Sequence, residues 1–139
     1  MLRNFLKITF NPLHLDILLL ILRVLVALFM LVHGVPKLMK FFANEPVKFA
    51  DPIGIGQFAT LLLTVFSEVI CSFLIFIGLA TRLAVIPLII TMLVAALIVH
   101  SGDSFGNKEA SLQYLLVYIT LFVLGSGKYS SDALLFKND

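Results

Sequence analysis

The sequence predicts an all-α integral membrane protein, a four-helix bundle with an interfacial segment between its first and second helices. Of the 139 residues, 60% are hydrophobic and 13% are charged, whereas a soluble domain has about 45–50% apolar and about 25% charged residues. In addition, four apolar runs approach the roughly 20 residues that a membrane span needs. A soluble fold of this length could not bury so much apolar surface, so we expect lipid to be the solvent for the surplus.

The four spans are expected at about residues 13–37, 57–79, 82–100 and 109–126, within a single membrane domain of residues 1–139. Each connection between them carries turn-forming or charged residues, which mark the ends of the spans. The third run is the shortest. Pro87 falls near its start, where a missing N–H costs less than in the middle, so this run still predicts a spanning helix.

Two segments are expected to lie along the membrane surface. Residues 38–56 combine aromatic and basic side chains, a composition typical of the headgroup region. Residues 1–12 are similar, and the long apolar run that follows them, with no small-x-small cleavage site, argues against a secretory signal. The residues concerned are Phe41, Phe42, Phe49, Lys40 and Lys48 in the first segment, and Arg3 and Lys7 in the second.

The distribution of basic residues favours cytoplasmic termini. An even number of spans places both termini on one side of the membrane, and the positive-inside rule compares the basic residues that flank the spans. Five lie on the terminal side (Arg3, Lys7, Arg82, Lys128, Lys137) and four on the opposite side (Lys37, Lys40, Lys48, Lys108).

Several classes of function are excluded by composition and motifs. The net charge is only +2 and forms no basic stripe, so nucleic acid is not an expected partner. Cys71 is the single cysteine, which excludes dithiol chemistry within the chain. The chain has no flavin or nucleotide fingerprint, so electrons would have to come from a partner or a bound cofactor. No metal site is expected, because zinc would need more ligands on one face.

Two charged residues fall deep within the predicted spans. Arg23 lies in the first span and Glu68 near the middle of the second, and each belongs to a polar stripe of its helix. Because an ionisable group in the bilayer is costly, it is usually paired with another polar group or has a functional role. We therefore expect Arg23 and Glu68 to form a buried charge pair, which either fixes the helix register or serves a function.

A second polar group is expected at the end of the bundle opposite the termini. The ends of the first, third and fourth spans bring imidazole, ammonium, carboxylate, amide and phenol groups to a similar depth, and Phe41, Phe42 and Phe49 could roof them. Such a cluster is typical of a quinone or proton-handling site, and equally of interfacial anchoring. Haem is not expected, because the two candidate ligands, His33 and His100, lie at helix ends. The candidates are His33, Lys37, His100, Glu109, Gln113 and Tyr114.

At the terminal end, a polar turn follows the fourth span. Its residues Lys128, Tyr129 and Asp132 are expected to pack under the bundle and to tie the tail to Arg82 or to the start of the first span.

The chain resembles the DoxX family of small bacterial membrane proteins. The resemblance rests on His33–Leu38, Glu68, the 78–84 turn, His100 and Glu109, and closes with the 125–132 segment. Ser131 departs from the pattern, where leucine is usual. The resemblance implies a four-helix protein of the bacterial inner membrane, related to the membrane subunit of thiosulfate:quinone oxidoreductase. It also implies an association with thiol and oxidative stress.

These observations lead to a quinone-facing membrane subunit or anchor of a redox complex that handles thiosulfate, thiols or oxidative stress. It would be a subunit of a quinone-linked oxidoreductase with a protein partner, and not a self-contained enzyme. One alternative is a small proton-coupled transporter that uses Glu68 with Arg23 beside it, which would require a homo-oligomer. The other alternative is a structural membrane scaffold.

Overall fold

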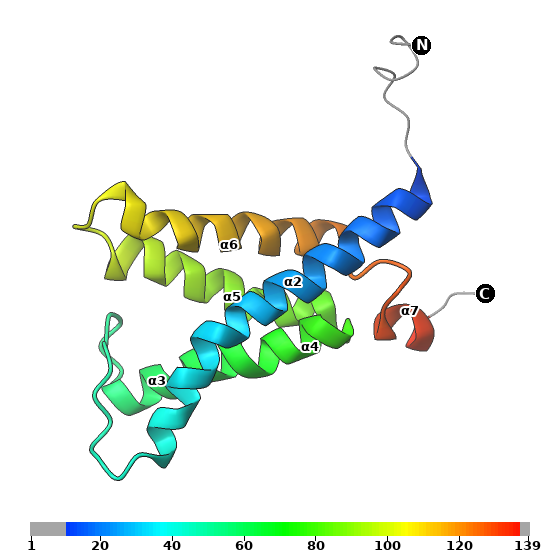
Figure 1. The fold of residues 1–139 in the computed structure, drawn as a ribbon. Helices are drawn as coiled ribbons and strands as arrows, with labels where there is room; N and C mark the ends of the chain where they lie inside the picture. The colour runs from blue at the N-terminus through cyan, green and yellow to red at the C-terminus, as the bar shows by residue number, and fades with distance from the viewer. Residues whose placement is uncertain (1–10, 137–139) are drawn as a thin grey trace.

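The computed structural model describes residues 11–136, and within this range every element of regular secondary structure is a helix (Figure 1). The predicted all-α fold is therefore confirmed. The surface arm expected in residues 1–12 lies almost wholly outside the described residues. The elements are α2 (Pro12–Met39), η1 (Lys40–Phe42), α3 (Gln57–Val65), η2 (Phe66–Cys71), α4 (Ser72–Ile77), α5 (Thr81–Val94), η3 (Ala95–Val99), α6 (Phe105–Leu124) and α7 (Ser131–Leu135).

Three helices in the described part of the chain are long and apolar enough to cross a membrane. They run over Pro12–Phe42, Gln57–Ile77 and Thr81–Val99. Helix α6 is not among them, since its first two turns carry Asn107, Lys108 and Glu109. It begins at Phe105, four residues before the expected start, because Ser104 provides an extended N-cap conformation there.

Two of the spanning helices contain a π-helical turn. The second span passes from α3 through η2 into α4, and the third passes from α5 into η3. A π turn inserts one extra residue into a helix and changes the direction of the side chains that follow it, and such turns are frequent at functional sites.

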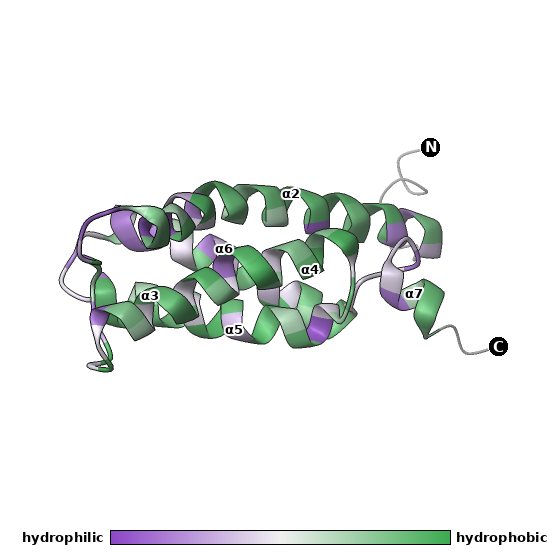
Figure 2. Cartoon of the chain, turned by 90° about the horizontal axis from the view of Figure 1, so that it is seen from below, coloured by the Kyte–Doolittle hydropathy of each residue, from purple (hydrophilic) through white to green (hydrophobic). Residues whose placement is uncertain are grey.

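The helices pack around a small core and leave most apolar side chains on the outside. Helix α5 lies along α6, while α2 crosses the second span and contacts α4 most closely (Figure 1). Most of the helical ribbon carries the colour of hydrophobic residues (Figure 2), and many of these side chains are exposed, among them Val32, Leu83 and Leu116. In a lipid environment this surface needs no further cover. The core includes Met30, Leu61, Ile75, Leu88, Tyr118 and Leu121.

The segment between α2 and α3 contains one short helix, η1, and otherwise has no regular structure up to Gln57. Its anchor is Asp51, whose carboxylate accepts hydrogen bonds from the backbone N–H groups of Ile55 and Gly56 at 3.0 and 2.9 Å. It also accepts one from the Thr60 hydroxyl at 2.9 Å. These bonds lower the pKa of Asp51, the backbone bond from Gly56 most of all.

Candidate functional site

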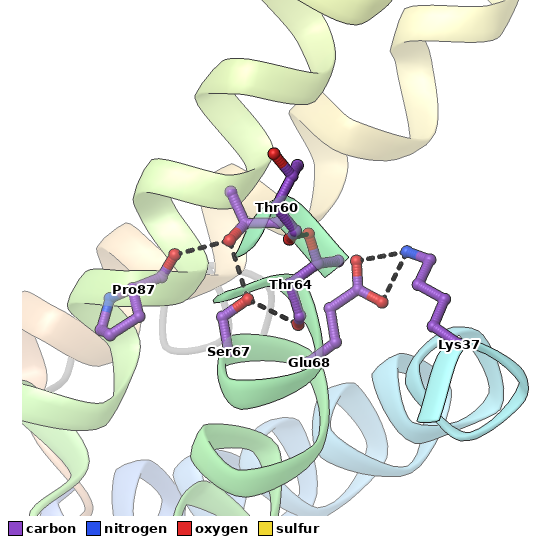
Figure 3. Close-up of polar contacts among 7 residues, drawn as sticks. Lys37, Thr60, Thr64, Ser67, Glu68 and Pro87 are labelled. Atoms are coloured by element: carbon purple, nitrogen blue, oxygen red, sulfur yellow. Dashed lines mark hydrogen bonds and ion pairs between the residues drawn. The ribbon is translucent and has the colours of Figure 1, made fainter. Parts of the chain in front are cut away.

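The predicted Arg23–Glu68 pair is wrong, because each residue binds a different partner. The Arg23 guanidinium turns toward the terminal end and donates to the backbone oxygens of Ser126 and Tyr129, at 2.9 and 2.7 Å. Glu68 instead receives the ammonium of Lys37, with both carboxylate oxygens 2.6 Å from Nζ (Figure 3). The long lysine stem lets Nζ reach back from the loop end of α2 into the bundle.

Glu68 owes its position to a π turn and to a close helix contact. It lies in η2, and only 3% of the residue is exposed. Gly34 of α2 packs directly on this turn, so closely that a Cβ atom there would lie 2.9 Å from the backbone oxygen of Glu68. Since no side chain separates the two backbones, Lys37, one turn beyond Gly34, meets the Glu68 carboxylate.

A chain of hydroxyl groups runs beside the ion pair along the inner face of the second span (Figure 3). The hydroxyls of Thr64 and Ser67 donate to the backbone oxygens of Thr60 and Thr64, at 2.8 and 3.0 Å. Ser67 Oγ also lies 2.8 Å from Thr91 Oγ1, and Thr91 donates to the Pro87 oxygen at 2.8 Å. These bonds join the second span to α5 and satisfy polar groups that lipid could not.

The ion pair lies at the floor of a cavity between the second and third spans, which we call the α3–α5 cavity. Its volume is about 360 Å³. His100, at the end of η3, and Phe49, in the loop between α2 and α3, also line it. The remaining polar lining is threonine, and the rest is apolar. Further lining residues are Thr60, Thr64, Thr91, Leu63, Ile90 and Val94.

A second cavity, the α2–α6 crevice, lies between α2 and α6 and has a volume of about 470 Å³. Apolar residues of α2, from Leu18 to Phe29, form most of it. Its polar lining consists of His33, Gln113 and Tyr114. The rings of His33 and Tyr114 meet edge to face at 6.0 Å, and Tyr114 stacks on Tyr118 at 6.1 Å.

The six residues expected in one pocket are therefore divided. Lys37 and His100 line the α3–α5 cavity, whereas His33, Gln113 and Tyr114 line the α2–α6 crevice. Placing these residues at one depth was not enough to place them on one side of the bundle.

Glu109 lines neither cavity, and the expected aromatic roof is only partly present. Glu109 accepts a hydrogen bond from Gln113 at 3.0 Å in an exposed position. Phe49 lines the α3–α5 cavity, but Phe41 packs against Phe58, with ring centres 5.5 Å apart, and Phe42 is 73% exposed.

His100 also has a partner outside the cavity. Its Nδ1 lies 2.7 Å from the Asp103 carboxylate, and this hydrogen bond is the main cause that lowers the pKa of Asp103. The bond leaves Nε2 of His100 without an assigned partner. In the described residues no cluster of three or more His, Cys, Asp or Glu side chains could hold a metal ion.

At the terminal end, hydrogen bonds of Arg23 and Asp132 join the C-terminal tail to the bundle. The Asp132 carboxylate accepts from the N–H groups of Ala80 and Thr81 at 2.6 and 3.0 Å and so caps α5. The N–H of Lys128 donates to Asp16 at 2.9 Å, which joins the tail to the start of α2. Arg82 takes a different partner, the Val123 oxygen, at 3.1 Å.

The sequence analysis missed α7 and the partner of Glu68. Helix α7 had a local signal, since Ser130 caps it by accepting from the Ala133 N–H at 3.1 Å. The sequence feature that could have indicated Lys37 as the partner of Glu68 is Gly34, one turn before Lys37, because a small residue permits close helix contact.

These features define a multi-pass helical membrane protein with two largely apolar cavities between its helices, each lined by a few polar groups. The family model named DoxX matches residues 18–101. A Bacillus subtilis (strain 168) protein named "Putative oxidoreductase CatD" is 33% identical over 120 residues, which cover 85% of this chain and 87% of the relative. No solved structure matches the chain. The chain belongs to the DoxX family.

Proposed function

We propose that the protein binds a membrane quinone in the α2–α6 crevice and serves as the quinone-facing subunit of a redox complex. The observation that carries this proposal is the form of the crevice, a long apolar wall with imidazole, amide and phenol groups in its lining. A quinone has the same division, with an isoprenoid tail and a head ring whose oxygens accept hydrogen bonds. Ligand sites are commonly apolar with a few polar groups that fix orientation.

The charges around the crevice favour an uncharged head group. His33, Gln113 and Tyr114 can all donate hydrogen bonds, and the charged residue bonded to Gln113 is Glu109. A carboxylate in this position disfavours a phosphate head group. The apolar wall includes Phe29, which is 56% exposed, so a tail can enter sideways from lipid.

The same proposal includes the placement of the chain in the membrane. Helix α6 forms the fourth span, because it lies along α5 and has an apolar second half. The termini face the cytoplasm of a bacterial inner membrane, and residues 38–56 lie along the outer surface. A protein partner delivers the electrons, since the chain carries no flavin or nucleotide fingerprint. The Bacillus relative is named a "Putative oxidoreductase", which is in line with this role.

The test is calorimetric titration of the purified protein in lipid nanodiscs with a short-chain ubiquinone. We expect binding to weaken about tenfold in His33→Leu and in Tyr114→Phe, since each removes one hydrogen-bonding group. Lys37→Gln is the control outside the crevice and should bind normally. No binding to the unmodified protein, or equal binding to all three variants, would contradict the proposal.

A further inference from the structure

The α3–α5 cavity is not used by the proposed quinone site. Its floor is an ion pair whose two side chains differ in exposure, with 29% of the Lys37 side chain exposed against 4% for Glu68. Both residues line the cavity, and the lysine side chain is the more accessible of the two.

The hydrogen-bonding groups of the cavity select an acceptor as ligand. The hydroxyls of Thr60, Thr64 and Thr91 already donate to protein oxygens. The donor left in the lining is the third N–H of Lys37, whose Nζ bonds both oxygens of Glu68. Nδ1 of His100 donates to the Asp103 carboxylate, so Nε2 of the neutral ring is an acceptor. A carboxylate supplies the acceptor that the Lys37 ammonium needs.

The charges around Glu68 determine how an anion can enter. Lys37 of α2 neutralises Glu68, and His100 faces the same cavity from the third span. From α6, Tyr114 and Tyr118 lie within reach of the Glu68 charge. The other carboxylate nearby, Asp51, is held by Thr60 and two backbone N–H groups. An added anion would leave one net negative charge in a low-dielectric site, which is costly unless a proton accompanies it.

The walls of the cavity determine the rest of the ligand. They are formed mainly by apolar residues such as Leu63, Ile90 and Val94. A cavity of 150 Å³ admits a benzene molecule, so a volume of about 360 Å³ accommodates a fused two-ring system. The complementary ligand is a hydrophobic molecule of this size with one acidic group.

We infer that the α3–α5 cavity binds a hydrophobic weak acid as its anion, together with one proton that is taken up by Glu68. The anion replaces Glu68 as the partner of Lys37, and the proton, drawn from solvent, leaves Glu68 as a neutral carboxylic acid. One anion and one proton enter, so the charge of the site is unchanged. This inference does not rest on quinone binding in the α2–α6 crevice.

The probe is 2-naphthoate, titrated by calorimetry into the full chain in nanodiscs. Repeating the titration in two buffers of different ionisation heat counts the protons, and we expect one taken up for each anion bound. By linkage, the dissociation constant should then rise about tenfold per pH unit, or about 100-fold between about pH 6 and about pH 8. The neutral ketone 2-acetonaphthone should bind without proton uptake.

Variants separate this mechanism from simple charge attraction. Glu68→Gln should bind 2-naphthoate without proton uptake and with an affinity independent of pH, and Lys37→Gln should lose binding. Lys40→Gln, one turn after Lys37 in the chain and outside the cavity lining, is the matched control and should resemble the unmodified protein. His33→Leu should also bind normally, which separates this test from that of the quinone site.

Two results would overturn the inference without any ion-pair variant. One is binding of 2-naphthoate to the unmodified protein with no proton taken up, and the other is no binding. If Glu68→Gln fails to fold, Ile90→Trp fills the cavity from the lipid side and leaves the ion pair in place. Binding that survives Ile90→Trp unchanged would place the ligand elsewhere and would equally overturn it.

Discussion

The two buried charges of the bundle, Arg23 and Glu68, are held in opposite ways. Both residues are almost fully buried, with 2% and 3% exposed. Arg23 is fixed by two backbone oxygens of the C-terminal tail, whereas Glu68 is fixed by one flexible side chain beside a cavity. Backbone oxygens have no alternative charge state, but a lysine can move and a carboxylate can take a proton. We therefore expect the Arg23 contacts at the terminal end to stabilise the fold, and the Lys37–Glu68 pair at the loop end to be able to change partners.

The contrast predicts that the largest loss of stability comes from Arg23. In Arg23→Met the Ser126 and Tyr129 oxygens lose their charged donor, and each unsatisfied buried group costs about 1–3 kcal/mol. We expect the free energy of unfolding to fall by about 3 kcal/mol, measured by denaturant titration in detergent. Arg82→Met, which removes one exposed bond to Val123, is the control and should lose much less. Equal losses would show that the tail does not depend on Arg23.

Gly34 tests the contact that sets the position of Glu68 at the loop end. A Cβ at this position would lie 2.9 Å from both the Glu68 backbone oxygen and Val69 Cγ2. Gly34→Ala should therefore push α2 from η2, lower stability by about 1–3 kcal/mol, and speed the chemical acetylation of Lys37. Gly106→Ala, whose Cβ would have no neighbour within 4 Å, is the matched control. An unchanged acetylation rate in Gly34→Ala would show that the close contact does not hold the ion pair.

Asp132 tests the terminal end through a weaker interaction. Its carboxylate caps α5 at the N–H groups of Ala80 and Thr81. Loss of a helix N-cap typically costs about 0.5–2 kcal/mol, so Asp132→Ala should destabilise the protein by about 1 kcal/mol, measured by the same denaturant titration. Asp103→Ala, in the opposite loop, is the control for removing a carboxylate. A larger loss from Asp103 would reverse the contrast between the two ends.

How far the sequence predicts this fold depends on the range of each interaction. Apolar runs predict four spans, and three of them coincide with helices in the described residues that are long and apolar enough to cross a membrane, because composition decides them. The capping pattern at Ser130 and Asp132 is also local, so α7 could have been predicted from the sequence, although it was not. The π turn at Glu68 arises from packing against α2 and α5 and leaves no local pattern in the sequence.

The candidate site was harder to predict than the helices. Depth along each helix follows from a rise of about 1.5 Å per residue, and it placed the polar residues of the loop end at one level. Depth alone does not say which side of the bundle a residue faces. His33 and His100 were therefore assigned to one pocket, whereas in the structure they line two different cavities. The partner of Glu68 was missed for a related reason, because depth ignores the reach of a lysine stem.

The smallest expected effect concerns Asp51, which holds the loop over the α3–α5 cavity. The hydrogen bonds it accepts, first from the Gly56 N–H, lower its pKa in the folded protein. A carboxyl whose folded pKa lies below its unfolded value, about 3.9 for Asp, stabilises the fold above that value. This stabilisation is lost as the pH falls through the folded pKa. The loop should therefore loosen in acid, below about pH 4.

Hydrogen exchange measures this loosening at single residues. The amides of Ile55 and Gly56, which bond the Asp51 carboxylate, should lose protection in acid after correction for intrinsic exchange. In Asp51→Asn the amide side chain keeps one acceptor oxygen and does not titrate in this range, so protection should be weaker and independent of pH. Because Asp51 is exposed, its loss should leave global unfolding almost unchanged. If acid removed protection equally at the two ends of the bundle, the loop end would not be the more exchangeable of the two.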